Sequence, residues 1–108
     1  MQHEFEGLTL FYVPIGSMED ARRVSRILIE EALAACVNII PGTSIYKWEG
    51  KITEEPEFYM VIKTKKILEP EVAARLKEIH PYKVPCIIRL HPAGVNIEYM
   101  DWLLSGLR

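Results

Sequence analysis

The segment from residue 32 to residue 52 (ALAACVNIIPGTSIYKWEGKI) constrains the fold more than any other part of the chain. It begins as the end of an amphipathic helix, continues as a β-branched run, breaks at Pro41-Gly42, and resumes as an aromatic alternation before Gly50. This pattern predicts a helix, a long strand and a tight turn. The strand is too long for a small domain, and Tyr46 and Trp48 near its tip need packing partners that so short a chain cannot supply. We therefore expect a hairpin arm that contacts another subunit.

Length and charge limit the possible functions. A chain of 108 residues forms one domain, which we expect to span residues 1–108. No stretch approaches the ~18 consecutive apolar residues of a membrane span. Thirteen Lys and Arg are interleaved with fifteen Asp and Glu, so there is no basic surface to neutralise phosphates. We expect a partner that is neither nucleic acid nor membrane.

The N-terminus and the cysteines indicate the compartment. Residues 1–7 have neither the basic region nor the apolar core of a secretory signal, and we expect a short flexible tail on a cytoplasmic protein. Cys36 and Cys86 each lie in an apolar run, where a thiol behaves as a small hydrophobe. We expect both cysteines to be reduced and buried.

Helix and strand signals alternate along the chain. Residues 8–15 read as a strand, and Ser17 suits the N-cap of a helix whose apolar face comprises Ala21, Val24, Leu28, Ala32 and Ala35. After the arm, the return strand runs through residues 53–57, which Pro56 marks as an edge or a bulge, into residues 58–62. A second helix follows from Pro70 to about His80, where Pro81 ends it. A fourth strand covers residues 86–90, and Asn96 caps a last short helix.

This order predicts an α+β fold, a ferredoxin-like βαββαβ sandwich with a long β-hairpin arm and an extra C-terminal helix. Right-handed crossovers place the first strand between the third and the fourth, with the second strand at an edge. Cys36 and Cys86 then lie about 14 Å apart, too far for a disulfide. One sheet face keeps only the terminal helix as cover. That face and the arm favour a closed oligomer, of which a ring of three is the smallest head-to-tail form.

Five blocks of sequence carry a family resemblance: Ala34-Ala35-Cys36-Val37-Asn38, residues 44–52 (SIYKWEGKI), Ile62-Lys63-Thr64, residues 80–85 (HPYKVP), and Tyr99 with Trp102. In this order and spacing they resemble the CutA family of divalent-cation tolerance proteins, over nearly the whole chain. The resemblance implies a ferredoxin-like fold, a tight homotrimer with strands paired across subunits, and a cytoplasmic role in tolerance to copper and other divalent cations. It implies no catalytic activity, and for animal relatives an acetylcholinesterase-anchoring role.

Three residues within the family motifs are candidate metal ligands, namely Cys36, His80 and Glu57. Their chemistry suits copper or another divalent cation, but no C-x-x-C or H-x-x-x-H spacing supports them. A packed thiol at Cys36 and a helix-terminal role for His80 are the structural alternatives. The chain also departs from the family, because its first strand lacks a cysteine and Cys86 replaces the usual glutamate after the HPYxxP motif.

A second candidate is an inter-subunit cleft formed by Trp48, Tyr46, Lys63 and Tyr82. By analogy of fold with the PII signalling proteins, such a cleft would bind a small anionic effector. Packing within a trimer is the structural alternative for the two arm aromatics. No nucleophile motif or phosphate-binding loop is present, so we expect neither an enzyme nor an organic cofactor.

Overall fold

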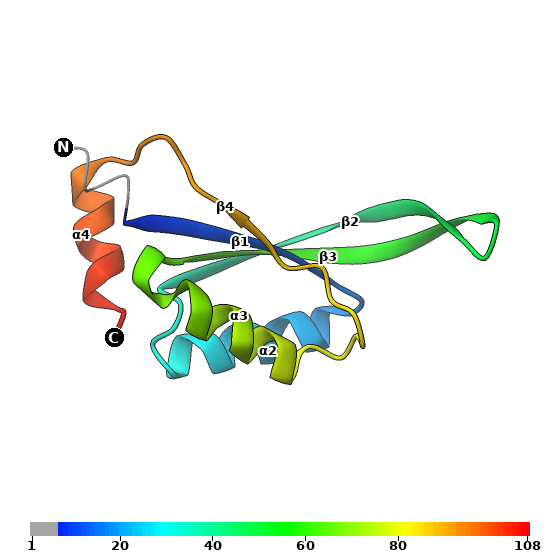
Figure 1. The fold of residues 1–108 in the computed structure, drawn as a ribbon, viewed down its shortest axis with the longest axis horizontal. Coiled ribbons are helices and arrows are strands. Elements are labelled where there is room, and N and C mark those ends of the chain that lie inside the picture. Colours follow the sequence, from blue (N-terminus) through cyan, green and yellow to red (C-terminus); the bar gives the residue numbers. More distant parts are fainter. Residues whose placement is uncertain (1–6) are drawn as a thin grey trace.

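A computed structural model describes residues 7–108, and the tail expected at the N-terminus lies largely outside them. The elements follow the predicted alternation (Figure 1). In chain order they are β1 (Leu8–Ile15), α2 (Met18–Glu30), β2 (Cys36–Trp48), β3 (Lys51–Lys65), a 3-10 helix η1 (Lys66–Leu68), α3 (Glu69–Ile79), β4 (Ile88–Leu90) and α4 (Ile97–Ser105).

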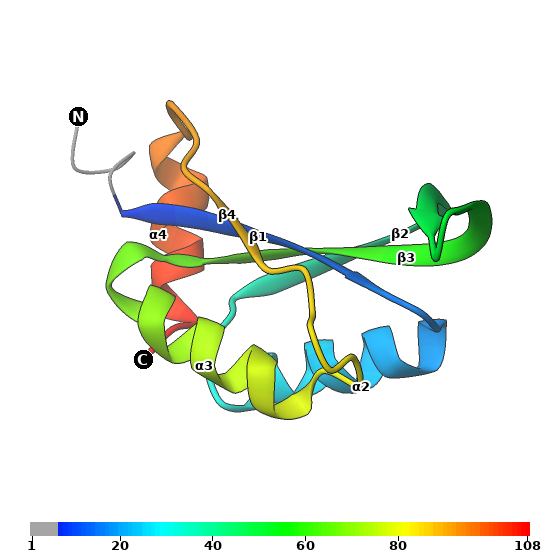
Figure 2. The same ribbon diagram turned by 45° about the vertical axis from the view of Figure 1, so that its right-hand side comes forward.

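The four strands form one antiparallel sheet in the order β2-β3-β1-β4. This confirms the predicted strand order, with β1 between β3 and β4 and with β2 at an edge. Helices α2 and α3 lie together on one face of the sheet, whereas α4 stands at the opposite end from the arm (Figures 1 and 2). The described chain is therefore a mixed α+β fold of a four-stranded antiparallel sheet and three α-helices.

The core lies between the sheet and the two helices α2 and α3. Alternate residues of β1 and β3 point into it, and α2 and α3 supply residues at helical spacing. These side chains are fully buried and comprise Phe11, Val13, Ile15, Met60, Ile62, Val24, Leu28, Val72 and Leu76. Burial of each one stabilises the fold by about 1.5–3 kcal/mol.

Helix α2 begins as predicted but ends earlier. The Ser17 side chain accepts a hydrogen bond from the Asp20 N–H, so Ser17 is the N-cap. The predicted continuation through Ala32 and Ala35 is wrong, because Ala32 adopts φ of 58° and the helix stops at Glu30. A left-handed residue cannot continue a right-handed helix. The turn that follows buries Leu33 instead.

Strand β4 is shorter than predicted, and Cys86 lies before it in an exposed position. The expectation that Cys86 is buried on a strand is therefore wrong for the isolated chain. The segment that follows α3 joins the sheet only at Ile88, which pairs with Tyr12 of β1. Pro85 has no N–H group, so it cannot extend the backbone hydrogen bonds between the two strands. Cys36 is half-buried at the start of β2, and neither thiol forms a disulfide.

The arm is a two-stranded ribbon that extends beyond the rest of the sheet. Strands β2 and β3 pair without a bulge from Cys36 opposite Lys63 to Trp48 opposite Lys51. Strand β1 accompanies β3 only over residues 58–65, so the outer half of the hairpin has no other neighbour in the sheet. Glu49 and Gly50 have φ of 49° and 79°, as the two-residue hairpin turn of type I′ requires.

Within residues 7–108, little covers the face of the sheet turned away from α2 and α3. Helix α4 covers only one end, where Leu8 is buried with Met100 and Leu103. Beyond that end, the open face carries Tyr12 stacked on Tyr59 with ring centroids 5.8 Å apart, and the half-exposed Ile40, Ile88 and Leu90. We call this surface the open face.

A buried carboxylate joins α3 to β1 and β4. Glu69 accepts hydrogen bonds from Thr9 Oγ1 at 2.6 Å, from His91 Nε2 at 2.6 Å and from Arg89 Nη1 at 3.3 Å. Burial alone would raise the pKa of Glu69, but these hydrogen bonds outweigh it and hold the pKa below its ordinary value. The short strand β4 is thus fastened by side chains as well as by its ladder.

Replacing this carboxylate should change how stability depends on pH. Because the pKa of Glu69 is lowered on folding, its contribution is complete above the ordinary pKa of 4.5 and is lost as the pH falls through the folded value. Urea denaturation at several pH values should show Glu69→Gln about 1–3 kcal/mol less stable than wild type near neutral pH. The difference should shrink in acid.

Glu19→Gln is the matched control, because Glu19 also lies in the first turn of a helix but is exposed. It should leave the stability within about 0.5 kcal/mol of wild type. Equal losses for the two variants would contradict the role given to the Glu69 hydrogen bonds.

Candidate functional site

A hollow on the described chain lies where the arm meets the segment between α3 and β4. Its volume is about 580 Å³, and it is lined by Tyr46, Trp48, Glu55, Glu57, Tyr82 and Val84. We call it the arm pocket. A volume of this order suits a small organic molecule.

The register of the hairpin places four of these side chains on one face of the arm. Tyr46 pairs with Thr53, and Trp48 pairs with Lys51. Alternate residues of a strand share a face, so Glu55 and Glu57 lie on the same side as the two aromatic rings. At the base of the arm, a Cβ at Gly42 would lie 2.5 Å from the Tyr59 ring, so only glycine lets that ring lie across β2.

Two tyrosine hydroxyls donate to the two carboxylates. Tyr46 donates to Glu55 Oε1 at 3.0 Å, and Tyr82 donates to Glu57 Oε2 at 3.1 Å. Burial, and then the hydrogen bond to Glu57, raise the pKa of Tyr82 to about 12. The hydrogen bond to Glu55 is the main cause that raises the pKa of Tyr46. Both phenols are therefore neutral at pH 7, and the polar groups of the pocket carry negative charge.

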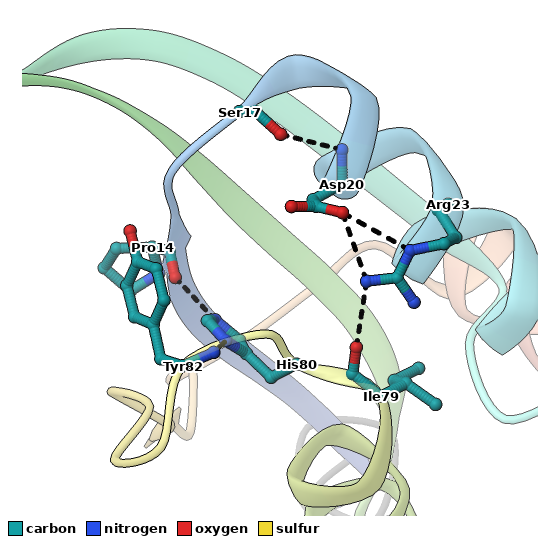
Figure 3. Close-up of polar contacts among 7 residues, drawn as sticks. All are labelled: Pro14, Ser17, Asp20, Arg23, Ile79, His80 and Tyr82. Atoms are coloured by element: carbon teal, nitrogen blue, oxygen red, sulfur yellow. Dashed lines mark hydrogen bonds and ion pairs between the residues drawn. The ribbon is translucent and has the colours of Figure 1, made fainter.

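His80 positions Tyr82 for this contact (Figure 3). The imidazole is only 6% exposed, and its Nε2 donates to the Pro14 carbonyl at 2.9 Å. Its Nδ1 accepts the Tyr82 N–H at 3.1 Å, and the two rings meet edge to face at 4.7 Å. With one nitrogen donating and the other accepting, this neutral imidazole has no lone pair left for a metal ion.

A second contact fixes the end of α3 to α2. Arg23 donates to the Ile79 carbonyl at 3.0 Å and pairs with Asp20 at 3.3 Å (Figure 3). The carbonyl groups at a helix C-terminus have no partner within the helix, so this guanidinium satisfies one of them. The segment that carries Tyr82 therefore starts from a fixed point.

The predicted metal ligands do not meet within one chain. Glu57 lines the arm pocket, His80 lies behind Tyr82, and Cys36 lies opposite Lys63. Lys63 and Glu57 are six positions apart along β3, which places Cys36 about 20 Å from that carboxylate. Across residues 7–108, no three His, Cys, Asp or Glu side chains are grouped to hold a metal ion.

Three of the four residues predicted for the effector cleft do meet. Trp48, Tyr46 and Tyr82 all line the arm pocket, whereas Lys63 donates to the Tyr99 hydroxyl at 3.2 Å near α4. Glu55 was not among the predicted residues. A two-residue turn at Glu49-Gly50 fixes the cross-strand pairs, so counting back from this turn would have placed Glu55 opposite Ser44, on the face that carries Tyr46.

Comparison with known proteins identifies the family. The model of the CutA1 divalent ion tolerance protein family matches residues 9–105. The chain belongs to this family. It is 48% identical over 99 residues to the divalent-cation tolerance protein CutA of Thermus thermophilus, covering 91% of this chain and 94% of that protein.

Solved CutA structures share the fold. The CutA structure from Synechococcus elongatus superposes with a TM-score of 0.92 at 33% identity, covering 95% of this chain and 92% of that one. The periplasmic divalent cation tolerance protein CutA of Archaeoglobus fulgidus gives a TM-score of 0.88 at 37% identity, covering 94% and 99%. No helix within residues 7–108 is both long and apolar enough to cross a membrane.

The raised pKa of Tyr82 can be measured by alkaline titration. The difference in phenolate absorbance between wild type and Tyr82→Phe should show one group with a midpoint near 12, against the ordinary 10.0. Glu57→Gln should lower this midpoint, because it removes the anionic acceptor. Circular dichroism would confirm that each protein is folded at each pH.

Glu54→Gln is the control for this titration, since Glu54 lies on the other face of β3, opposite Ile45. It should leave the midpoint unchanged. A Tyr82 midpoint near 10 in the wild type would refute the contact with Glu57.

Proposed function

We propose that the chain is a divalent-cation tolerance protein that works in the cytoplasm as a homotrimer of ferredoxin-like subunits, and that it binds copper or another divalent metal ion without catalysing a reaction. Family membership supports the general role. The proposal of a trimer rests on one observation, the exposed apolar surface that runs from the open face onto the arm.

Both faces of the arm carry exposed large apolar side chains. Tyr46 and Trp48 are 41% and 63% exposed on one face, and Ile45 and Ile52 are 65% and 80% exposed on the other. A ribbon with large apolar side chains on both faces is unfavourable in water unless it is inserted between other surfaces. Other copies of the same chain supply such surfaces, because each copy has an open face and an unpaired edge at β2.

A head-to-tail contact between arm and sheet closes most simply as a ring of three. In this arrangement the arm of one subunit lies against the sheet of the next. The Tyr12–Tyr59 stack and the half-exposed Ile40, Ile88 and Leu90 would then be buried. Each of the large aliphatic side chains buried in this way adds about 1.5–3 kcal/mol at most.

Metal binding in this proposal depends on the assembly. Cys36 and Glu57 lie on the same face of the sheet, since their cross-strand partners place them an even number of residues apart. They are too far apart to share an ion within one chain, but Glu57 lies toward the arm that contacts the next subunit. A thiolate suits copper, and a carboxylate suits harder divalent cations. His80 supports the fold rather than ligating the ion.

The assembly can be tested by light scattering during size-exclusion chromatography. The wild type should elute at three times the chain mass of 12.5 kDa. Ile52→Lys should shift the population toward the monomer, because it places a charge on a buried arm surface. Ile67→Lys is the matched control, since Ile67 is 78% exposed on η1, away from the arm. A monomeric wild type at micromolar concentration would refute the trimer.

Metal binding can be tested by calorimetric titration with copper and with zinc. Cys36→Ser and Glu57→Gln should each weaken binding about tenfold or more, as loss of a ligand does. His80→Ala should lower the stability by about 1–3 kcal/mol through its lost hydrogen bonds, with little change in affinity. Cys86→Ser is the control. Equal weak binding by all of these proteins would leave only adventitious sites and contradict a specific metal role.

A further inference from the structure

The side of the sheet that carries the open face has opposite charges at its two ends. Alternation along β3 places Glu55 and Glu57 on this side of the arm, and Lys63 and Lys65 on the same side at the other end of the strand. Helix α4 stands at that end, opposite the arm (Figures 1 and 2). Six positions of β3 between Lys63 and Glu57 amount to about 20 Å, so these charges cannot meet within one chain.

The carboxylates of the arm pocket meet only neutral donors within residues 7–108. Glu55 accepts from the Tyr46 hydroxyl and Glu57 from the Tyr82 hydroxyl, and neither forms an ion pair. No lysine or arginine is among the lining residues of the pocket. The proposed trimer covers this face of the arm, and covering two anions without a positive charge is costly. The covering surface should therefore supply a cation.

Lys63 is a cation in the complementary situation. It is half-buried, its Nζ donates to the neutral Tyr99 hydroxyl at 3.2 Å, and it lies 5.3 Å from the centroid of that ring. Among residues 7–108 it has no carboxylate partner. The ring of Trp102, 53% exposed, lies 5.5 Å from that of Tyr99 and extends the aromatic surface. We call Lys63, Tyr99 and Trp102 the α4 patch.

We propose that the arm pocket receives the α4 patch of a second copy of this chain, with Lys63 of the next subunit lying between Glu55 and Glu57. This inference rests on the proposed homotrimer and names the two surfaces that build it. Each subunit offers its arm pocket to one neighbour and its α4 patch to the other, so the contact is head-to-tail and closes as a ring. The ammonium and the carboxylates form charge-assisted hydrogen bonds, and the aromatic rings around them exclude water.

The same docking brings the two proposed metal ligands together. Cys36 is the direct cross-strand partner of Lys63, so the two side chains start about 5 Å apart on one face. When Lys63 of the next subunit enters the arm pocket, Cys36 of that subunit approaches Glu57. The thiol and the carboxylate, about 20 Å apart in one chain, then lie on adjacent subunits at one place.

Lys51 is the competing cation on this side of the sheet. It lies at the tip of the arm, opposite Trp48, so it would reach the carboxylates of another subunit only if the arms met one another. Lys51 is exposed, whereas Lys63 is half-buried. An exposed ammonium is already solvated, but a half-buried one gains more from an anionic partner. The α4 patch is therefore the better complement of the pocket.

Zero-length cross-linking tests this contact on the full chain, with a chelator present. A carbodiimide joins a carboxylate to a lysine amine where the two are in contact. The wild type should give covalent multimers on a denaturing gel, and mass spectrometry should find Lys63 of one chain joined to Glu55 or Glu57 of another. The joined residues share the segment 52–65, so two copies of this segment in one product show a link between chains.

Two arginine variants identify the lysine. Lys63→Arg keeps the positive charge but has no amine to couple, so the product should disappear while light scattering shows an unchanged mass. Lys65→Arg is the matched control, because Lys65 lies on the same side of β3, and it should keep the product. An oligomeric wild type without the Lys63 product, or one in which Glu55 and Glu57 couple to Lys51 instead, would overturn the proposal.

Dilution measures what the charge contributes to the assembly. Lys63→Gln should raise the dissociation constant of the oligomer about tenfold or more, as loss of one partner of a buried charge pair does. Lys65→Gln should leave the constant within about threefold of wild type, as expected for a charge at the rim. Circular dichroism would confirm that both variants are folded. Equal effects of the two substitutions would contradict the role of Lys63.

These outcomes separate this docking from the proposed function. A trimer without the Lys63 product rejects the docking and leaves the trimer in place. A dimer with the product keeps the contact and rejects the ring of three, because the same two surfaces can also meet twice across a two-fold axis. A monomeric wild type rejects both.

Discussion

The cross-strand register of the β2–β3 hairpin is the constraint on which the rest of the structure depends. A left-handed pair at Glu49 and Gly50 closes the hairpin, and every pair down to Cys36 and Lys63 follows without a bulge. A slip of one residue would move each side chain to the opposite face. The core would then lose Met60 and Ile62, and the arm pocket would lose its carboxylates. The turn at Glu49-Gly50 therefore determines both which side chains enter the core and which carboxylates line the arm pocket.

Two buried polar side chains, Glu69 and His80, fix the position of α3 and of the segment that follows it. Glu69 joins the start of α3 to β1 and β4, and His80 joins the end of α3 to β1. Each satisfies its hydrogen-bonding capacity with partners from elements distant in sequence, which makes the burial of a polar side chain tolerable. The long segment between α3 and β4 is thus anchored at both ends, although β4, which follows it, contributes only three residues to the sheet. This anchoring places Tyr82 against Glu57.

Much of the fold followed from the sequence because its signals were local and periodic. The apolar run of β1, the N-cap at Ser17 and the turn at Gly50 each depend on a few neighbouring residues. The end of α2 was mispredicted because Ala32 and Ala35 continue the helical spacing. Ala32 adopts a left-handed conformation, and the sequence has no glycine at this position that would have indicated it. The extent of β4 was mispredicted because it depends on where the chain meets β1, which is a tertiary contact.

The candidate site was less accessible to sequence reasoning. Trp48, Tyr46, Tyr82 and Lys63 were predicted to meet in a cleft between subunits; within one chain the first three line the arm pocket, whereas Lys63, opposite Cys36, lies near α4. His80 was treated as a ligand because its residue type suits metals, and only the structure shows that both ring nitrogens are already engaged. Residue type alone does not reveal whether a lone pair is free.

The outer ribbon of the hairpin has a thermodynamic consequence. Only one layer of structure supports it, and two-stranded ribbons without a second layer are marginally stable in water. In a single chain the ribbon should open at a lower free energy than the body of the sheet. Any partner that covers the ribbon adds its binding energy to this local equilibrium, so the order of the arm becomes a function of protein concentration while the body remains folded.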